Sequence, residues 1–236
     1  MQQTDNGFKL DIIYEDNHLI AVNKTVHDLV QKDKTGDIAL DDMIRAYIKQ
    51  KYNKPGNVFL GVIHRLDRPV SGVVLFARTS KALSRMNEKF RENEIKKSYW
   101  AIVKDKPPAD HDTLKHFMVR NTKQNKSYCH INEVEGSKLA ELDYQLIAKS
   151  DKYFLLEIDL KTGRHHQIRS QLATIGCAIK GDLKYGFARS NPDGGISLHA
   201  RQISFSHPVS GEIHTLIAQP PAEDKLWEFF SAQLKA

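Results

Sequence analysis

The stretch HRLDRPVSG, residues 64–72, places one carboxylate, Asp67, between the guanidinium groups of Arg65 and Arg68. The proline and the glycine within it disfavour a regular helix, so we expect a loop. The apolar run GVVLFAR, residues 72–78, overlaps its end and is typical of a buried strand. Because nearby guanidinium groups favour the charged form of an acid, the sequence predicts an ionised carboxylate on a loop that leads into a central strand.

Composition limits the kinds of protein that this chain can be. A chain of 236 residues with 40% hydrophobic residues can bury a substantial core. The net charge of +6 fits a polyanionic partner or an ordinary protein surface equally well. Cys129 and Cys177 are the only cysteines, which favours a reducing compartment. Without a leader-like start or an apolar run near the ~18 residues of a membrane span, we expect a cytoplasmic protein with no membrane association.

The apolar pattern along the chain predicts an α+β fold. Apolar runs and period-two patterns predict strands at 12–14, 19–22, 72–78, 97–103, 140–148, 153–160, 196–205 and 212–219. Patterns with three- and four-residue steps predict helices at 39–52, 80–93 (capped by Ser80), 165–176 and 223–234. Residues 106–135 are polar, with weak strand character near Val119 and Tyr128. Strands in runs favour a mixed, largely antiparallel sheet, and without a linker or repeat we expect one domain over residues 1–236.

Other kinds of chemical site find little support in the sequence. His165 and His166 are adjacent and lack a second ligand at the spacing of zinc enzymes, and His111, His116 and His130 have no matching cysteine pair. No phosphate-binding glycine loop and no G-x-S-x-G turn is present. We therefore expect neither a metal nor another cofactor.

A retaining glycosidase would need a second carboxylate roughly 5 Å from the first. Glu157 and Asp159 lie on a predicted strand, but nothing in the sequence links them to Asp67. They are better interpreted as the solvent-facing residues of a half-buried strand.

Three longer motifs resemble those of the RluA-type pseudouridine synthases. They are GVIHRLDRPVSGVVLFARTSKA at 61–82, KKSYWAIV at 96–103, and IDLKTGRHHQIRSQLATIGCAIKGDLKYG at 158–186. They occur in the order that the family shows, and with the flanking strands the resemblance covers roughly residues 10–220.

The resemblance implies a cofactor-free isomerase that converts uridine to pseudouridine in structured tRNA or rRNA. Uracil detaches from the ribose, rotates and rejoins through carbon. The implied fold is the pseudouridine synthase fold, a central sheet flanked by helices and loops with a catalytic cleft across it. We expect a monomer. Because the resemblance starts near residue 10, we also expect no separate amino-terminal RNA-binding (S4) domain, which many members carry.

The resemblance also assigns catalytic roles to Asp67, Tyr99 and Arg169. From the residues alone, Tyr99 would more often be core packing on a period-two strand. Arg169 is expected at the margin of a buried helical stripe, from which it could extend toward a cleft. Whether Arg65, Arg68 or Arg169 pairs with Asp67 stays open at this point.

A uridine in structured RNA must leave its stack to be reached, which costs a few kcal/mol that phosphate contacts and stacking can offset. Basic and aromatic groups near the motifs are therefore candidates for RNA binding. We predict this role for Arg65, Arg68, Arg164, His166, Lys180 and Lys184.

The sequence departs from the family pattern at a few positions. Val70 stands where threonine is common, Gln171 replaces the second histidine of HQIR-x-H, and Ala178 replaces a frequent proline. VNKTVHDLV, residues 22–30, lacks the usual N-K-P-x-G form. Two rival functions remain, an RNA-binding module without turnover and a nucleoside or glycoside hydrolase. The three assigned catalytic residues are all present, which favours the isomerase.

Overall fold

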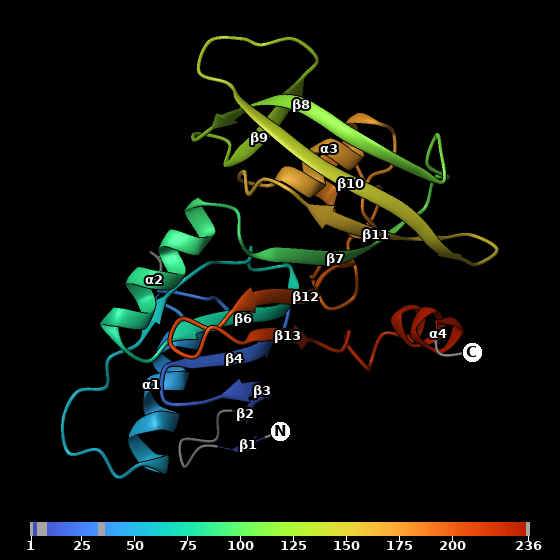
Figure 1. Ribbon diagram of the computed structural model, residues 1–236. Coiled ribbons are helices and arrows are strands. Elements are labelled where there is room, and N and C mark those ends of the chain that lie inside the picture. Colours follow the sequence, from blue (N-terminus) through green and yellow to red (C-terminus); the bar gives the residue numbers. More distant parts are fainter. Residues whose placement is uncertain (1, 4–8, 33–35, 235–236) are drawn as a thin grey trace. The chain divides into compact units, whose positions relative to one another are not determined.

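The computed structural model of the chain describes residues 2–3, 9–32 and 36–234 (Figure 1). The chain forms two compact units. Unit 1 comprises the chain up to Ile95 together with Arg201–Gln219, and unit 2 comprises Lys96–Ala200 together with Pro220–Ala236. Unit 1 is thus built from two segments that lie far apart in the sequence. Both units combine strands with helices, so the α+β class is confirmed.

The strands of unit 1 pair in antiparallel fashion. Their bounds are Ile12–Glu15 (β3), Leu19–Lys24 (β4), Gly61–Val62 (β5), Ser71–Ala77 (β6), Leu198–Ser206 (β12) and Ile213–Ile217 (β13), with β1 (Gln2–Gln3) and β2 (Lys9–Leu10) in a separate ladder. β4 pairs with β3 on one side and with β6 on the other. β5 pairs with the Ala77 end of β6, and β13 pairs with β12. The strands predicted at 12–14 and 19–22 are confirmed, and they pair as a hairpin.

Helix α1, Leu40–Lys51, packs its apolar stripe onto this sheet. Leu40, Ile44 and Ile48 are almost fully buried and share one core with Ile20 of β4 and Phe76 of β6. The three- and four-residue spacing of these side chains is what places them on one helix face. The helix predicted at 39–52 is confirmed.

Helix α2, Ser80–Arg91, follows β6 after a short turn. Its cap is Thr79, whose hydroxyl accepts a hydrogen bond from the amide of Ala82 at 3.2 Å, so the expectation that Ser80 caps this helix is wrong by one residue. Ala82 and Met86 face the protein interior. The remaining side chains are mainly polar, as expected of a surface helix.

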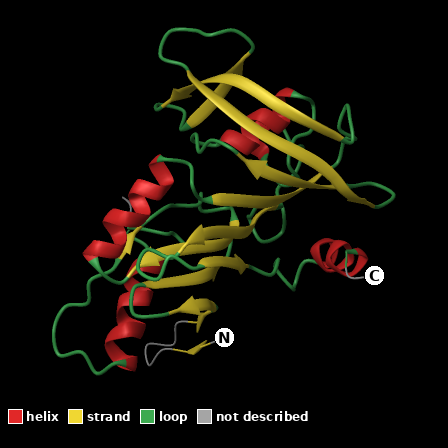
Figure 2. Ribbon diagram, viewed as in Figure 1, coloured by secondary structure: helices red, strands yellow, loops and turns green. Residues whose placement is uncertain are grey.

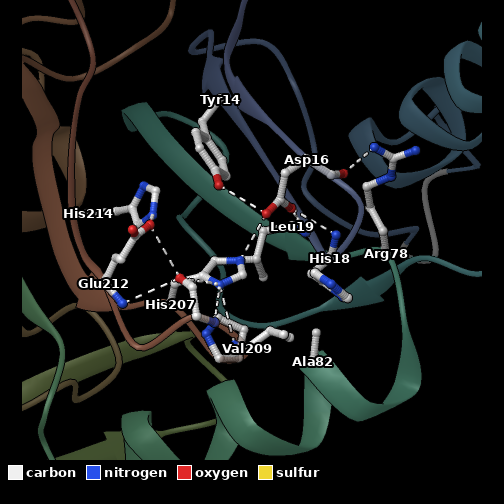
Figure 3. A network of polar contacts seen from close by, with 12 residues as sticks. Tyr14, Asp16, His18, Leu19, Arg78, Ala82, His207, Val209, Glu212 and His214 are labelled. Carbon is white, nitrogen blue, oxygen red and sulfur yellow. Dashed lines mark hydrogen bonds and ion pairs between the residues drawn. The ribbon is translucent and has the colours of Figure 1, made fainter.

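The turn between β3 and β4 is tied to the β12–β13 connection by a polar network (Figure 3). Asp16 accepts hydrogen bonds from the amides of His18 (2.8 Å) and Leu19 (2.6 Å) and from the Tyr14 hydroxyl (3.0 Å). Nε2 of His207 lies 2.9 Å from Asp16 Oδ2. Burial raises the pKa of Asp16, but these hydrogen bonds outweigh it and lower the pKa below the usual value.

Glu15 joins β3 to α1 through hydrogen bonds to its largely buried carboxylate. Its carboxylate, 9% exposed, accepts hydrogen bonds from Lys51 (2.7 Å), Tyr52 (2.8 Å), Tyr47 (2.9 Å) and Arg78 (3.1 Å). Burial raises the pKa of Glu15, whereas the bonds from Lys51, Tyr52 and Tyr47 together lower it below its ordinary value of 4.5. The stabilisation by this carboxylate is therefore present above that value and is lost as the pH falls.

Glu15→Gln is expected to lower the free energy of unfolding at neutral pH by roughly 2–3 kcal/mol, because it leaves the buried guanidinium of Arg78 without its charge partner. Urea unfolding measures the change. The matched control is Glu94→Gln, which removes an exposed partner of Lys89 and should cost less than ~1 kcal/mol. Equal losses in the two variants would contradict the role of the Glu15 cluster.

Unit 2 is centred on a second run of antiparallel strands. The bounds are Lys96–Val103 (β7), His111–Asn121 (β8), Lys126–His130 (β9), Lys138–Lys149 (β10) and Phe154–Leu160 (β11). The pairing order is β7, β11, β10, β8 and β9. β8 and β10 are the long neighbouring strands that Figure 2 shows in yellow.

The polar stretch 106–135 contains more strand than its weak pattern predicts. β8 is 11 residues long, and β9 pairs with it as a hairpin. Leu114, His116 and Met118 are buried on β8, while Lys115 between them is exposed. Burial thus alternates with period two, but a histidine occupies one of the buried positions and hides the apolar pattern.

The helices of unit 2 are α3, Gln167–Thr174, and α4, Lys225–Gln233, with the short helix η1, Leu183–Tyr185. Asp224 caps α4 by accepting hydrogen bonds from the amides of Leu226 and Trp227. Trp227 and Phe230 then pack with Trp100 of β7 in a buried apolar cluster.

Candidate functional site

The loop that carries Asp67 lies between β5 and β6 of unit 1. The amide of Val70 donates to the carbonyl of Asp67 at 3.0 Å and closes a tight turn directly before β6. His64 accepts a hydrogen bond from the amide of Leu75 at 3.1 Å and stacks on Phe90 with a ring separation of 5.2 Å. The histidine of the HRLD motif is therefore a structural residue that fixes the loop to its neighbouring strand.

Lys24 holds the other side of the same loop. It ends β4 opposite Gly72, and it is 1% exposed. Its ammonium nitrogen donates to the carbonyl oxygens of Thr25 (2.7 Å), Arg68 (2.8 Å) and Val70 (2.8 Å). Three acceptors satisfy the three protons of an ammonium group. The residues on both sides of Pro69 are thus bound to one buried side chain.

The buried position of Lys24 changes its acidity. Burial lowers the pKa of Lys24 to about 7, while the carboxylates of Asp28 and Asp67 raise it and the guanidinium of Arg68 lowers it. Lys24 is thus a basic side chain that interacts electrostatically with Asp67, and it was not among the predicted site residues. Its only signal in the sequence is its place in VNK, the start of the altered N-K-P-x-G pattern.

The two arginines beside Asp67 differ in their contacts. Arg68 pairs with Asp37 at 2.7 Å and donates from Nε to the carbonyl of His27 at 3.2 Å. The guanidinium of Arg68 thus pairs with the carboxylate of Asp37, whereas the motif suggested the carboxylate of Asp67. Arg65 is exposed.

A hollow of about 440 Å³ lies beside the HRLD loop in unit 1. Arg65 and His64 line it together with Gln31, Arg45, Leu60, Val62 and Ile63. Arg45 is neutralised there by Asp41 (2.9 Å) and Asp42 (3.3 Å). Arg65 is exposed at this surface, so its guanidinium can reach an anionic group.

The segment before α3 departs from the helix predicted at 165–176. His166 is the residue before the helix and has a left-handed backbone (φ 53°), so α3 begins at Gln167. The His165 and His166 rings stack, with centroids 3.8 Å apart. His166 Nδ1 is 3.0 Å from the Tyr185 hydroxyl, and His165 Nδ1 is 2.9 Å from the Ser127 hydroxyl. No side chain of the described residues caps the start of α3. The contacts to Tyr185 and Ser127, which lie far away in the sequence, support the left-handed backbone at His166 instead.

Arg169 is buried rather than placed at the margin of the helix, which corrects the sequence expectation. Its Nε and one terminal nitrogen donate to the two oxygens of Asp182 at 2.7 and 2.9 Å. The guanidinium carbon also lies 5.1 Å from the centre of the Tyr185 ring. Asp182 and Tyr185 belong to the segment GDLKYG, residues 181–186, and no role was predicted for either residue.

Tyr99 lies on β7 opposite Ile158 of β11 and is 9% exposed. Asp67 belongs to unit 1, whereas Tyr99 and Arg169 belong to unit 2. Within unit 2, one of the residues predicted to be catalytic lies on a strand and the other on a helix.

The residues predicted to bind RNA differ in exposure. Arg65, Arg68, Arg164 and Lys184 are exposed, whereas His166 is buried. Lys180 is partly buried and donates to the Asn191 side chain at 2.7 Å. Arg164 donates to the carbonyl of Leu139, and Lys184 to the carbonyl of Asn125.

Gln171, the departure from the family histidine, is completely buried. Its amide nitrogen donates to the carbonyl of Leu114 at 2.9 Å and lies 3.1 Å from Nδ1 of His116. Burial lowers the pKa of His116, which keeps that ring neutral and able to accept the bond. Glutamine at this position therefore links α3 to β8.

The turn at 180–182 depends on a glycine. Gly181 has φ +88°, and a Cβ there would lie 2.7 Å from Cγ of Asn191 and 2.8 Å from the carbonyl oxygen of Gly195. The Asn191 amide cannot easily move away, because Lys180 and Ser197 both bind it.

Gly181→Ala is expected to lower the free energy of unfolding by about 3 kcal/mol or more, since strain and a clash combine. Gly176→Ala is the matched control, because Gly176 has φ +82° but open space around it. The control should cost only about 1–2 kcal/mol. Chemical denaturation measures both, and equal costs would refute the steric argument.

In the part of the chain that the structure describes, no group of three or more histidine, cysteine or acidic side chains could hold a metal ion. No helix in those same residues is long and apolar enough to cross a membrane.

Comparison with known proteins agrees with the three motifs. The family model described as RNA pseudouridylate synthase matches residues 18–174. An uncharacterized RNA pseudouridine synthase of Synechocystis sp. is 33% identical over 218 residues, which cover 90% of this chain and 66% of that relative. This chain therefore spans just under two thirds of the length of the cyanobacterial relative.

Two further similarities cover nearly the whole chain. The tRNA pseudouridine synthase C of Haemophilus ducreyi is 32% identical over 250 residues, covering 95% of this chain and 96% of the relative. The solved structure of human RNA pseudouridylate synthase domain containing 4 superposes with a TM-score of 0.76 at 22% identity, covering 95% and 92% of the two chains, and supports the fold. The chain therefore belongs to the RNA pseudouridylate synthase family, as its motifs imply, and with it to the isomerases that act on RNA.

Proposed function

We propose that this chain isomerises uridine to pseudouridine in structured tRNA or rRNA, without a cofactor, and that Asp67 is its catalytic carboxylate. The observation that carries the proposal is the HRLD loop, which buried Lys24 and His64 fix from two sides. The named relatives include a tRNA pseudouridine synthase and a ribosomal large subunit pseudouridine synthase, the latter from Rickettsia prowazekii at 31% identity over 89% of this chain.

The chemistry requires an ionised carboxylate. The bond between N1 of uracil and C1′ of the ribose breaks, a bond between C5 and C1′ forms, and the hydrogen on C5 leaves to solvent while N1 gains a proton. An ionised carboxylate can attack, or stabilise positive charge on the sugar. We propose that Tyr99 packs against the uracil and that Arg169 is the catalytic cation.

RNA binding is proposed for Arg65, Arg68, Arg164, His166, Lys180 and Lys184. The four exposed members suit phosphate contacts. Such contacts help to offset the few kcal/mol needed to extrude the target base. We further propose a single catalytic domain with its core at about residues 10–220, acting as a monomer in the cytoplasm. Two free thiols, Cys129 and Cys177, support a reducing compartment.

The test is tritium release from RNA whose uridines carry tritium at C5. An isomerase releases tritium to water and leaves the base attached to the chain. A hydrolase instead releases tritiated uracil, and a binding module without turnover releases nothing. Bulk tRNA and rRNA from cells lacking this chain serve as separate substrates, and mapping pseudouridine in each assigns the substrate class. Failure to release tritium from both would overturn the proposal.

A further inference from the structure

Asp182 is a buried acid that the proposed chemistry does not itself use. Its side chain is 1% exposed, and both of its oxygens accept hydrogen bonds from Arg169, which is 6% exposed. Such a two-point pair fixes the orientation of a guanidinium plane as well as its position. The pair lies entirely within unit 2.

Tyr185 restrains the same guanidinium from its aromatic face. The Arg169 guanidinium carbon is 5.1 Å from the ring centre, within the range of a cation–π contact. The tyrosine hydroxyl accepts from the amide of Ser127 at 2.9 Å and lies 3.0 Å from His166 Nδ1. Since the ring is anchored at its far end, it forms a fixed surface beside Arg169.

The backbone around Asp182 is equally constrained. Its amide donates to the carbonyl of Ile179, and its carbonyl accepts from the amides of Tyr185 and Phe187. The preceding Gly181 cannot accommodate a side chain. The carboxylate is therefore presented from a rigid turn, 13 residues after the arginine that it binds.

We propose that Asp182 is a positioning residue that holds the guanidinium of Arg169 in its catalytic orientation, with Tyr185 as the second restraint. This inference rests on the proposed role of Arg169 in the isomerisation. An arginine side chain has several rotatable bonds, and without the carboxylate its orientation is lost while its charge remains. Asp182 itself, being buried, makes no contact with RNA.

The test compares Asp182→Asn with Asp143→Asn in the full-length chain. Asp143 lies on β10 of the same unit, and its partner Lys161 is a surface residue, so the control makes the same chemical change away from Arg169. Asp182→Asn is expected to lower kcat on the order of 10–100-fold while KM for RNA changes less than about threefold. The control should leave both constants at native values.

Asp182→Glu separates positioning from folding, because it keeps the charge and moves it by one methylene. We expect Asp182→Glu to recover part of the lost kcat, and it also serves as the deciding variant if Asp182→Asn fails to fold. A native kcat in the folded Asp182→Asn variant, a rise in KM alone, or an equal kcat loss in Asp143→Asn would each overturn the inference.

A second measurement keeps this inference separate from the proposed function. Nitrogen-edited NMR of the arginine side chains should show a slowly exchanging Arg169 Nε–H signal in the native chain, and that signal should shift and exchange rapidly in Asp182→Asn. An unchanged signal overturns the positioning role even in an active enzyme. If the native chain releases no tritium from any RNA, the proposed function fails, whereas this signal still reports whether Asp182 orients Arg169.

Discussion

Asp67→Asn is expected to reduce tritium release from C5-labelled RNA to background, a fall on the order of 10⁴-fold or more. An amide has the shape of the carboxylate but neither its charge nor its nucleophilicity, so it can neither attack the nucleotide nor stabilise positive charge on the ribose. RNA affinity should be retained or slightly increased, because a negative charge is removed from a surface that binds a polyanion.

The matched control is Asp42→Asn on α1 of the same unit. Asp42 is half-buried and pairs with Lys32 and Arg45, so the substitution makes the same change of charge on a helix and not within the HRLD loop. Its rate of tritium release should equal that of the native chain. Asp67→Asn with substantial turnover and a native circular dichroism spectrum would remove Asp67 from the mechanism.

Lys24→Met is expected to lower tritium release by about 100-fold while RNA binding stays near native, because a displacement of about 1 Å at a reacting group can have an effect of this size. The substitution keeps the apolar stem but leaves the carbonyl oxygens of Thr25, Arg68 and Val70 without their donor. The turn that carries Asp67 then loses one of its two anchors. Single-turnover kinetics with saturating enzyme measure the loss.

Lys24 should also give native stability a characteristic pH dependence. Burial lowers the pKa of Lys24 from 10.5 to about 7. Between these values the unfolded chain binds more protons than the folded chain, so the free energy of unfolding rises with pH across this window. The contribution is fully present above pH 10.5 and is lost as the pH falls through 7. In Lys24→Met this part of the slope should disappear.

Lys81→Met is the control for both measurements, since Lys81 is an exposed residue in the first turn of α2. It should retain the native rate and the native pH dependence of unfolding. A Lys24→Met variant that folds and turns over like this control would show that the buried ammonium does not support the catalytic loop.

Apolar periodicity is sufficient to predict the helices of unit 1 and the central strands. Leu40, Ile44 and Ile48 recur along one helix face, and their burial follows directly from that spacing. The Asp16 turn likewise follows from local chemistry, because an aspartate can accept hydrogen bonds from the amides that follow it. Such features depend on neighbours in the sequence.

Contacts between distant residues account for what the sequence did not predict. The left-handed His166 is held by Tyr185, and β8 buries His116 at a position where a pattern of apolar residues would be expected. The acceptors of Lys24 are backbone carbonyls, which no side-chain pattern encodes. Within the candidate site, the motif predicts a role for Arg169, but only the fold reveals that Arg169 is buried and paired with Asp182.

The two-segment construction of unit 1 has a consequence for biosynthesis. A ribosome releases the residues up to Ile95 long before Arg201–Gln219, which supply β13 and His207. During translation the residues up to Ile95 therefore exist for a time without β13 and without the His207 imidazole, which lies beside Asp16 in the folded protein. We expect the nascent chain to pass through an intermediate with incomplete pairing, and unit 1 is completed only when Arg201–Gln219 joins the residues up to Ile95.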